Sequence, residues 1–258
     1  MNAFRAFALN QIPLVGMNNN LAKIILDAVE KEGLEIEDGD VMVVAQKIFS
    51  KAEGRIVDLT KIVPSEKALE IGKITGKDPR FVQIVLNESK KIIKLSEDIL
   101  LVEDNRGLVC INAGIDKSNV QGKDNFGLLP QDPDQSAGKL MLDIDKLTGK
   151  KVVVIICDTY SRPFRRGQVN FAIGIAGINP FRDYRGKKDL FGQILRVKNI
   201  AVADEIAAAA ELLMGQGEEG TPVVIFKGMS NLAFQKCEKC STGQLFISAE
   251  EDLFKDSL

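Results

Sequence analysis

Histidine is absent from this 258-residue chain. The sequence therefore lacks the side chain that ordinarily carries protons at neutral pH, and it offers no serine–histidine or cysteine–histidine pair for nucleophilic catalysis. It also contains no G-x-S-x-G motif and no G-x-x-x-x-G-K-[ST] phosphate-binding loop. An enzyme with this composition has to work mainly by positioning its substrates and neutralising charge, as phosphoryl-transfer enzymes do.

Long apolar runs and a strong excess of one charge are absent as well. No stretch reaches the length that spans a bilayer, and the opening residues, MNAFRAFALNQIPLV, lack the pattern of a signal peptide. The net charge of −2 disfavours general binding to nucleic acid. The content of 45% hydrophobic and 27% charged residues is typical of a soluble globular protein. We expect a cytoplasmic protein with one large domain or two modest ones.

The four cysteines fall into two kinds of sequence. Cys110 and Cys157 lie in apolar, strand-like runs and are interpreted as small core residues. Cys237 and Cys240 form a lone C-x-x-C, and no second pair or histidine is present to complete a four-ligand zinc site. We interpret this pair as two reduced surface thiols; a redox or metal-binding role is the alternative.

Helical periodicity and strand-like runs alternate irregularly along the chain. Helices are expected in residues 18–33, 64–76, 78–92, 132–149 and 203–215. Strands are expected at 41–45, 152–157, 199–203 and 222–226, with a hairpin over 99–111 that turns at 105–107. Asp134 is the expected N-cap of the fourth helix. The irregular mixture predicts an α+β fold. No Pro/Gly/Ser-rich linker occurs, so two lobes of mixed sheet and helices would be interleaved in sequence.

Acidic residues follow two of the apolar runs. Asp158 and Thr159 come directly after VVVIIC, and Asp116 comes after LVCINAGI, followed by Asn119. Carboxylate and hydroxyl oxygens are the ligands that Mg²⁺ and Mn²⁺ prefer. The hypothesis is that two acids at separate strand ends share one divalent cation. The alternative is that both acids merely begin turns, as aspartate often does.

Three arginines, Arg162, Arg165 and Arg166, follow Asp158 in the segment SRPFRRG. A guanidinium group binds phosphate or carboxylate through paired hydrogen bonds. We hypothesise that Arg165 and Arg166 act as catalytic residues, holding phosphate or carboxylate oxygens near the cation. The alternative is that one of the three only braces the loop.

Two further segments favour contact with phosphates. Gly215, Gly217 and Gly220 lie between a helix and a strand, where backbone N–H groups are able to approach phosphates, although Gly215 also suits a simple helix C-cap. Lys47 and Lys51 are four residues apart, so a helix would place both ammonium groups on one side. The alternative for the lysines is ordinary surface exposure.

Taken in order along the chain, several motifs resemble one family. They are IPLV, VVAQKIFSKAEGR, INAGIDKSNV, LLPQDPDQSA, ICDTYSRPFRRGQVNFAIGIAG, DYRGKKDLFGQ, VADEIAAAAELLMGQGEEGTPVV and AEEDLF. They resemble the GTP-dependent γ-glutamyl ligases of the deazaflavin coenzyme F420, and the resemblance covers nearly the whole chain. It implies that residues 1–258 form a single ligase unit of two structural lobes, and that two chains form an intertwined homodimer with the site in a groove between subunits.

The resemblance also implies roles for individual positions. The cation site would comprise Asp116, Asp158, Thr159 and Gln216. The nucleotide-binding motifs would comprise Ile12, Pro13, Leu14, Val15, Gln46, Lys47, Lys51, Asn119, Met214, Gly215, Gln216, Gly217, Glu218, Glu219, Gly220 and Thr221. Some relatives carry an acid at the position of Gln216, and a neutral amide is a weaker ligand. Glu218 or Glu219 would accept a proton from the incoming amine, or would be solvated loop charges.

The activity that the resemblance implies is the attachment of L-glutamate to the precursor F420-0, and then of further glutamates through γ-linkages. GTP, Mg²⁺ or Mn²⁺, and K⁺ as a further ion are the implied substrate and cofactors. The mechanism would pass through an acyl phosphate and release GDP and phosphate. Two alternatives remain: a γ-glutamyl ligase with another carboxylate acceptor, and a GTP-binding regulatory protein without turnover.

Overall fold

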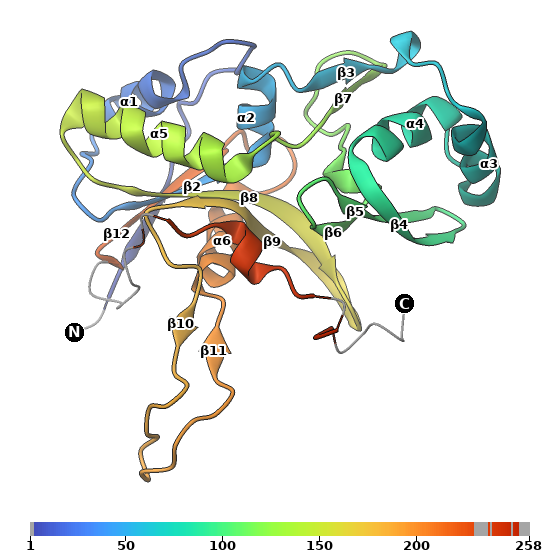
Figure 1. The fold of residues 1–258 in the computed structure, drawn as a ribbon. Helices are drawn as coiled ribbons and strands as arrows, with labels where there is room; N and C mark the ends of the chain where they lie inside the picture. The colour runs from blue at the N-terminus through green and yellow to red at the C-terminus, as the bar shows by residue number, and fades with distance from the viewer. Residues whose placement is uncertain (1–2, 230–236, 238, 249, 253–258) are drawn as a thin grey trace. The chain divides into compact units, whose positions relative to one another are not determined.

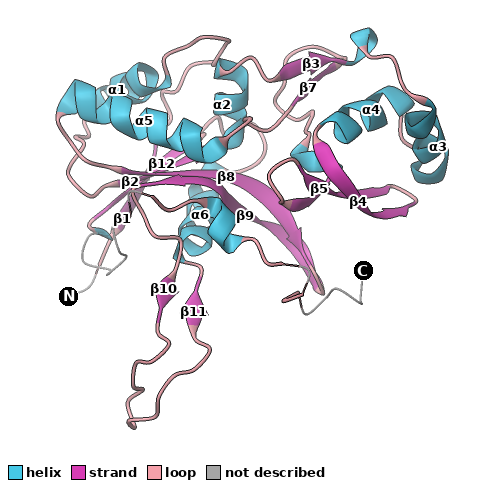
Figure 2. Cartoon of the chain, in the orientation of Figure 1, coloured by secondary structure: helices cyan, strands magenta, loops and turns pink. Residues whose placement is uncertain are grey.

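A five-stranded sheet organises most of the chain, and its strand order is β1-β12-β2-β8-β9. These strands are β1 (Arg5–Ala8), β12 (Val223–Lys227), β2 (Val41–Ala45), β8 (Val153–Arg162) and β9 (Arg165–Ala176). Only β2 and β8 run parallel; the other neighbours are antiparallel. The computed structural model describes residues 3–229, 237, 239–248 and 250–252 (Figure 1). The structure is thus a mixture of helices and sheets, which confirms the α+β prediction (Figure 2).

Contacts divide the chain into two compact units, each built from two stretches of sequence. The first unit comprises Met1–Ala52 and Gln131–Leu245, and the second comprises Glu53–Pro130 and Phe246–Leu258. Interleaved lobes and a homodimer remain predictions. No helix among the described residues combines the length and apolar character needed to cross a membrane.

Helices cover both faces of the sheet in the first unit. The helices α1 (Leu21–Lys31), α2 (Gln46–Ala52) and α5 (Pro133–Thr148) lie on one face, and α6 (Val202–Met214) lies on the other (Figure 1). Strands β2 and β8 are therefore buried on both sides, which explains their continuous β-branched sequences. Small residues of α6, including Ala203, Ala207 and Ala210, pack against the sheet and allow a close approach.

Local capping fixes where these helices begin and end. The side chain of Asn20 accepts a hydrogen bond from the N–H of Lys23 at the start of α1. At the start of α5 the cap is Asp132, which accepts from the N–H of Gln135, and Pro133 occupies the first helical position. The prediction of Asp134 as the cap is therefore wrong, because the proline places the helix start one residue after Asp132.

Strand β8 continues beyond its apolar run. It extends through Asp158 to Arg162 and forms a long hairpin with β9, which the sequence did not predict. The expectation that the strand ends at Asp158 is wrong. Near the end of β9, Gly174 faces the start of α5, where a side chain would collide with Pro133. Glycine at this position allows the helix to approach the bare backbone of the strand.

The remaining elements of the first unit are short. Strands β10 (Arg182–Asp183) and β11 (Asn199–Ile200) pair at the base of a long hairpin, and η4 (Thr242–Leu245) is a 3₁₀ turn (Figure 1). Cys237 and Cys240 form a disulfide with their Cα atoms 5.6 Å apart, so the prediction of two reduced thiols is wrong. Cys110 and Cys157 are buried, as predicted.

The second unit has its own core. It contains η1 (Leu59–Lys61), α3 (Glu66–Thr75), α4 (Pro79–Asn87), η2 (Asn112–Gly114), a β4-β5-β6 sheet (Ser89–Ser96, Ile99–Asp104, Val109–Ile111) and a β3-β7 pair (Ile56–Asp58, Asn125–Gly127). The buried carboxylate of Asp104 accepts the N–H groups of Arg106, Gly107 and Leu108, which confirms the predicted hairpin turn.

Candidate active site

Three predicted segments meet where the parallel pairing of β2 with β8 ends. Ala45, the last residue of β2, pairs with Cys157, so Gln46 and Asp158 follow at the same edge. The N–H of Ala45 donates to the carbonyl of Pro222 at 2.8 Å, which brings the end of the glycine loop beside them. Ligands commonly bind at the carboxyl ends of parallel strands. This edge of the first unit, with Gln46, Asp158 and the glycine loop, is the candidate site.

Asp158 and Thr159 point to opposite faces of the β8–β9 hairpin. Asp158 pairs with Phe171, whereas Thr159 pairs with Asn170 on the side that α6 covers. The hydroxyl of Thr159 donates to Oδ1 of Asn170 at 3.1 Å, and Nδ2 of Asn170 donates to the sulfur of Cys157 at 3.4 Å. The two predicted cation ligands therefore offer their side chains on different sides of the hairpin.

Helix α2 presents the two predicted lysines together. Gln46, which begins the helix, is 2% exposed, and its side-chain oxygen accepts from the hydroxyl of Ser50 at 2.7 Å. Partial burial lowers the pKa of Lys51, and the positive charge of Lys47 lowers it further. This confirms that both ammonium groups lie on one side of a helix. Two neighbouring ammonium groups are suited to binding an anion.

The glycine loop, residues Met214–Thr221, folds around one of its own carboxylates. The N–H of Gly217 donates to Oε2 of Glu219 at 2.8 Å, and a side chain on Gly215 would overlap that carboxyl group. The hydroxyl of Thr221 closes the loop by donating to the carbonyl of Met214 at 2.8 Å. The loop thus already presents a backbone donor to an anionic group, as a phosphate-binding loop must.

Glu211, in the last turn of α6, was missed by the sequence reasoning. Its Oε1 accepts a hydrogen bond from Nε2 of Gln216 at 2.8 Å. Its Oε2 is buried and has no hydrogen-bond partner among the described residues. Burial raises the pKa of the Cys157 thiol, and the charges of Asp158 and Glu211 raise it further, which places both carboxylates near that sulfur. An acid in a final helical turn opposes the helix dipole, and this was the signal available in the sequence.

The arginines lie at the tip of the β8–β9 hairpin. Arg162 pairs with Arg165, and its Nη2 donates to the backbone carbonyl of Arg166 at 3.2 Å. Arg162 therefore braces the tip, as one alternative predicted. Arg165 and Arg166 are exposed. Arg162 is four residue steps along the strand from Asp158, about 13 Å at the usual rise per residue. The catalytic role of Arg165 and Arg166 stays a prediction.

The other predicted residues are spread over both units. Ile12–Val15 form the loop before α1 in the first unit; Leu14 is exposed and Val15 is buried.

Asp116 and Asn119 belong to the second unit. Asp116 does not end a strand, because β6 stops at Ile111; it forms an isolated bridge with Gly127. Its carboxylate accepts the N–H of Ser118 at 2.8 Å and the hydroxyl at 2.6 Å. A cation shared by Asp116 and Asp158 stays a prediction. Among the described residues, no three histidine, cysteine or acidic side chains cluster as a metal site.

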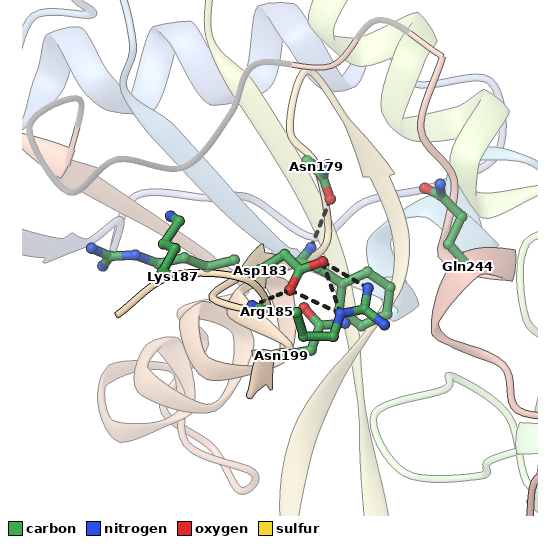
Figure 3. Close-up of a pocket in the computed structure, with 8 residues that line it drawn as sticks. Asn179, Asp183, Arg185, Lys187, Asn199 and Gln244 are labelled. Atoms are coloured by element: carbon green, nitrogen blue, oxygen red, sulfur yellow. Dashed lines mark hydrogen bonds and ion pairs between the residues drawn. The ribbon is translucent and has the colours of Figure 1, made fainter. Parts of the chain in front are cut away.

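A separate polar pocket of about 230 Å³ lies at the base of the β10–β11 hairpin (Figure 3). Arg185 binds both carboxylate oxygens of Asp183, and this ion pair lowers the pKa of Asp183 to about 2. Arg182 and Lys187, which also line the pocket, each lie 5.1 Å from the ring centre of Tyr184. This pocket carries part of the motif DYRGKKDLFGQ, and the sequence reasoning assigned it no role.

A carboxylate, a pair of lysines and a glycine loop that presents a backbone donor are features typical of enzymes that bind anionic substrates. The profile of the family described as F420-0:Gamma-glutamyl ligase matches residues 10–228. The chain belongs to this family, as the sequence motifs predicted.

Named relatives cover almost the same length. The Coenzyme F420:L-glutamate ligase of Archaeoglobus fulgidus is 46% identical over 98% of this chain and 96% of its own length. The proteins of the same name from Methanothermobacter thermautotrophicus and Methanocaldococcus jannaschii are 47% and 45% identical, over 84% and 86% of this chain and 86% of their own lengths. The similarity therefore extends over both structural units.

Proposed function

We propose that this protein is a GTP-dependent coenzyme F420-0:L-glutamate ligase. The observation that carries the proposal is the near full-length similarity to relatives named Coenzyme F420:L-glutamate ligase. The candidate site supports it, because the lysine pair of α2 offers positive charge and the glycine loop offers a backbone donor. We further propose that the protein acts as a cytoplasmic homodimer.

Amide formation from a carboxylate needs activation, because a carboxylate is a poor acyl donor. An oxygen of the acceptor carboxylate attacks the γ-phosphorus of GTP, the bond to the β-phosphate oxygen breaks, and GDP leaves. The amine of L-glutamate then attacks the acyl carbon, and inorganic phosphate leaves. One amide bond forms, and each turnover releases GDP, phosphate and a proton. The same chemistry extends the product by further γ-linked glutamates.

The chain's own residues supply charge and orientation for these steps. Lys47 and Lys51 would attract the triphosphate, and the glycine loop would exchange the carboxylate of Glu219 for a phosphate at the N–H of Gly217. Ile12–Val15, Gln46 and Asn119 would complete nucleotide binding. Arg165 and Arg166 would hold carboxylate or phosphate oxygens of a bound substrate.

The available oxygen donors fit hard divalent cations, since Asp158 offers a carboxylate, Thr159 a hydroxyl and Gln216 an amide. The buried, unpartnered Oε2 of Glu211 is a further sign that positive charge is needed nearby. Asp116, Asp158, Thr159 and Gln216 would hold Mg²⁺ or Mn²⁺, and Asp158 and Thr159 would bind separate ions because their side chains lie on opposite sides of the hairpin. When bound, the cation neutralises charge on the triphosphate and on the transferred phosphoryl group. We include K⁺ as a further ion of the reaction.

The test is to incubate the purified full-length protein with GTP, Mn²⁺ or Mg²⁺, L-glutamate and F420-0. We expect a product heavier by one glutamyl residue, with equal amounts of GDP and phosphate. Asp158→Asn should abolish turnover and preserve the fold, whereas Asp27→Asn, on the exposed side of α1, should retain full activity. GTP binding without turnover would indicate a regulatory protein, and a product formed only from another carboxylic acid would indicate a different acceptor.

A further inference from the structure

We propose that Glu211 is a positioning residue of the cation site. It fixes the side-chain amide of Gln216 so that the carbonyl oxygen is presented to the cation, and it supplies the negative charge that the neutral amide lacks. This inference rests on the proposed function, in which Gln216 is a cation ligand.

The hydrogen bond between the two side chains determines which end of the amide is available. A carboxylate only accepts hydrogen bonds, so the group that faces Glu211 has to be the NH₂ of Gln216. The bond from Nε2 to Oε1 of Glu211 is 2.8 Å long. The amide oxygen then points away from Glu211, and no described residue donates to it. Gln216 is thereby held with its one possible cation ligand accessible.

The second oxygen of Glu211 indicates that a positive charge belongs nearby. Oε2 is buried without a hydrogen-bond partner among the described residues, which is costly for a carboxylate. Its position in the last turn of a helix is also unfavourable, because the free carbonyl groups at a helix C-terminus repel a carboxylate. Glu211 carries both costs at the end of α6. A cation bound by the adjacent amide oxygen offsets both.

The neighbouring acids do not offer the same arrangement. Glu219 is bound to the N–H of Gly217, and Glu218 is exposed within the loop. Glu211 is also placed within α6, so it is able to fix the amide of Gln216 in the loop that follows. Carboxylates that orient a metal ligand in this way typically change metal affinity by roughly 10- to 100-fold when removed.

The experiment measures Mn²⁺ binding to the full-length protein by electron paramagnetic resonance of the unbound ion, with and without GDP. Glu211→Gln should weaken Mn²⁺ binding by about tenfold or more, because it removes the charge and the fixed amide orientation. The double variant Glu211→Gln with Gln216→Glu exchanges amide and acid within the pair, and should return the affinity to within about threefold of wild type. Glu205→Gln, an exposed acid in the first turn of α6, should bind Mn²⁺ as wild type does.

Thermal unfolding of each variant checks that the fold is intact. If Glu211→Gln does not fold, Glu211→Asp takes its place, because aspartate keeps the negative charge on a shorter side chain. It too should bind Mn²⁺ more weakly. Equal Mn²⁺ affinity in wild type and Glu211→Gln overturns the inference and leaves the proposed function standing. A wild type that binds Mn²⁺ but makes no glutamylated product overturns the proposed function alone. A wild type that binds no Mn²⁺ overturns the inference together with the cation role in that function.

Discussion

The carboxylate of Asp134 accepts a hydrogen bond from the backbone N–H of Ile175 at 2.8 Å. Asp204 accepts the N–H of Ala172 from the opposite face of the sheet, at 3.0 Å. Between them, Ile173 is the extra residue of a β-bulge, because Ile156 pairs with Gly174 and Cys157 with Ala172. Asp134 of α5 and Asp204 of α6 therefore accept hydrogen bonds from the backbone N–H groups on either side of the bulge.

Asp134→Ala should destabilise the fold. Asp134 also accepts from the N–H and hydroxyl of Thr242, so the substitution leaves several buried donors unpaired. At about 1–3 kcal/mol for each such group, we expect the free energy of unfolding to fall by at least about 2 kcal/mol. Urea denaturation measures it. Asp143→Ala, which removes only a surface ion pair with Lys146, is the control and should change stability little. Equal stability of the two variants would contradict the role of Asp134.

The second acid of the bulge predicts a dependence of stability on pH. Burial raises the pKa of Asp204, and the N–H of Ala172 only partly opposes it. The folded protein therefore binds a proton at Asp204 at a higher pH than the unfolded chain does, and this proton binding stabilises the folded state. This contribution is complete below the unfolded pKa and is lost as the pH rises through the folded pKa. Relative to Asp204→Asn, the wild type should gain stability as the pH falls through the raised folded-state pKa toward the unfolded value of about 4, as measured by urea denaturation. Parallel pH profiles would refute the prediction.

A buried ion pair joins β12 to the start of β2. Nζ of Lys227 lies 3.0 Å from Asp40 and 3.1 Å from Glu37, and Asp40 is 2% exposed. Lys227→Met leaves Asp40 buried without its cation, so we expect a loss of about 3–5 kcal/mol in the free energy of unfolding.

Chemical denaturation compares Lys227→Met with Lys146→Met, whose exposed pair should matter little. The hydrogen bonds to Asp40 and Glu37 outweigh burial and raise the pKa of Lys227. Its stabilising contribution is therefore present at neutral pH and is lost as the pH rises through that pKa. A loss below about 1 kcal/mol would show that the pair contributes little.

The lysine pair of α2 predicts a change in nucleotide affinity. Lys51 is partly buried and lies near the charge of Lys47, so a bound triphosphate should relieve the repulsion and raise the pKa of Lys51. Lys51→Met should weaken GTP binding by about tenfold, or about 1.4 kcal/mol. Isothermal titration calorimetry measures the affinity, and Lys23→Met on the exposed side of α1 serves as the matched control. Unchanged affinity in Lys51→Met would separate this helix from the nucleotide site.

The buried strands could be predicted because their sequences are continuously β-branched, whereas β9 could not. Its first half, RRGQVN, is polar and contains glycine, and it becomes a strand only by pairing with β8. The start of α5 depended on which of two aspartates, two residues apart, caps the helix: Asp132 does so, and Asp134 does not. The disulfide between Cys237 and Cys240 depended on backbone geometry that spacing alone does not fix.

The candidate site was only partly predictable for a similar reason. Asp158, the lysines and the glycine loop are recognisable from residue type and spacing. Glu211 gave only the weak signal of an acid in a last helical turn, because its role depends on Gln216 folding back onto α6 after the helix has ended. The placement of a side chain relative to a neighbouring loop is a tertiary property, and a glutamate within an alanine-rich helix resembles any solvated charge.

The alternation of side chains along β8 separates the chemistry of Asp158 from that of Thr159. Inserting one residue before Asp158 would turn the carboxylate toward α6 and bring its predecessor to the opposite surface. The position of each residue along β8, as well as its identity, therefore decides on which face of the hairpin its oxygen donor lies. Descendants of this sequence should accept substitutions here more readily than insertions or deletions.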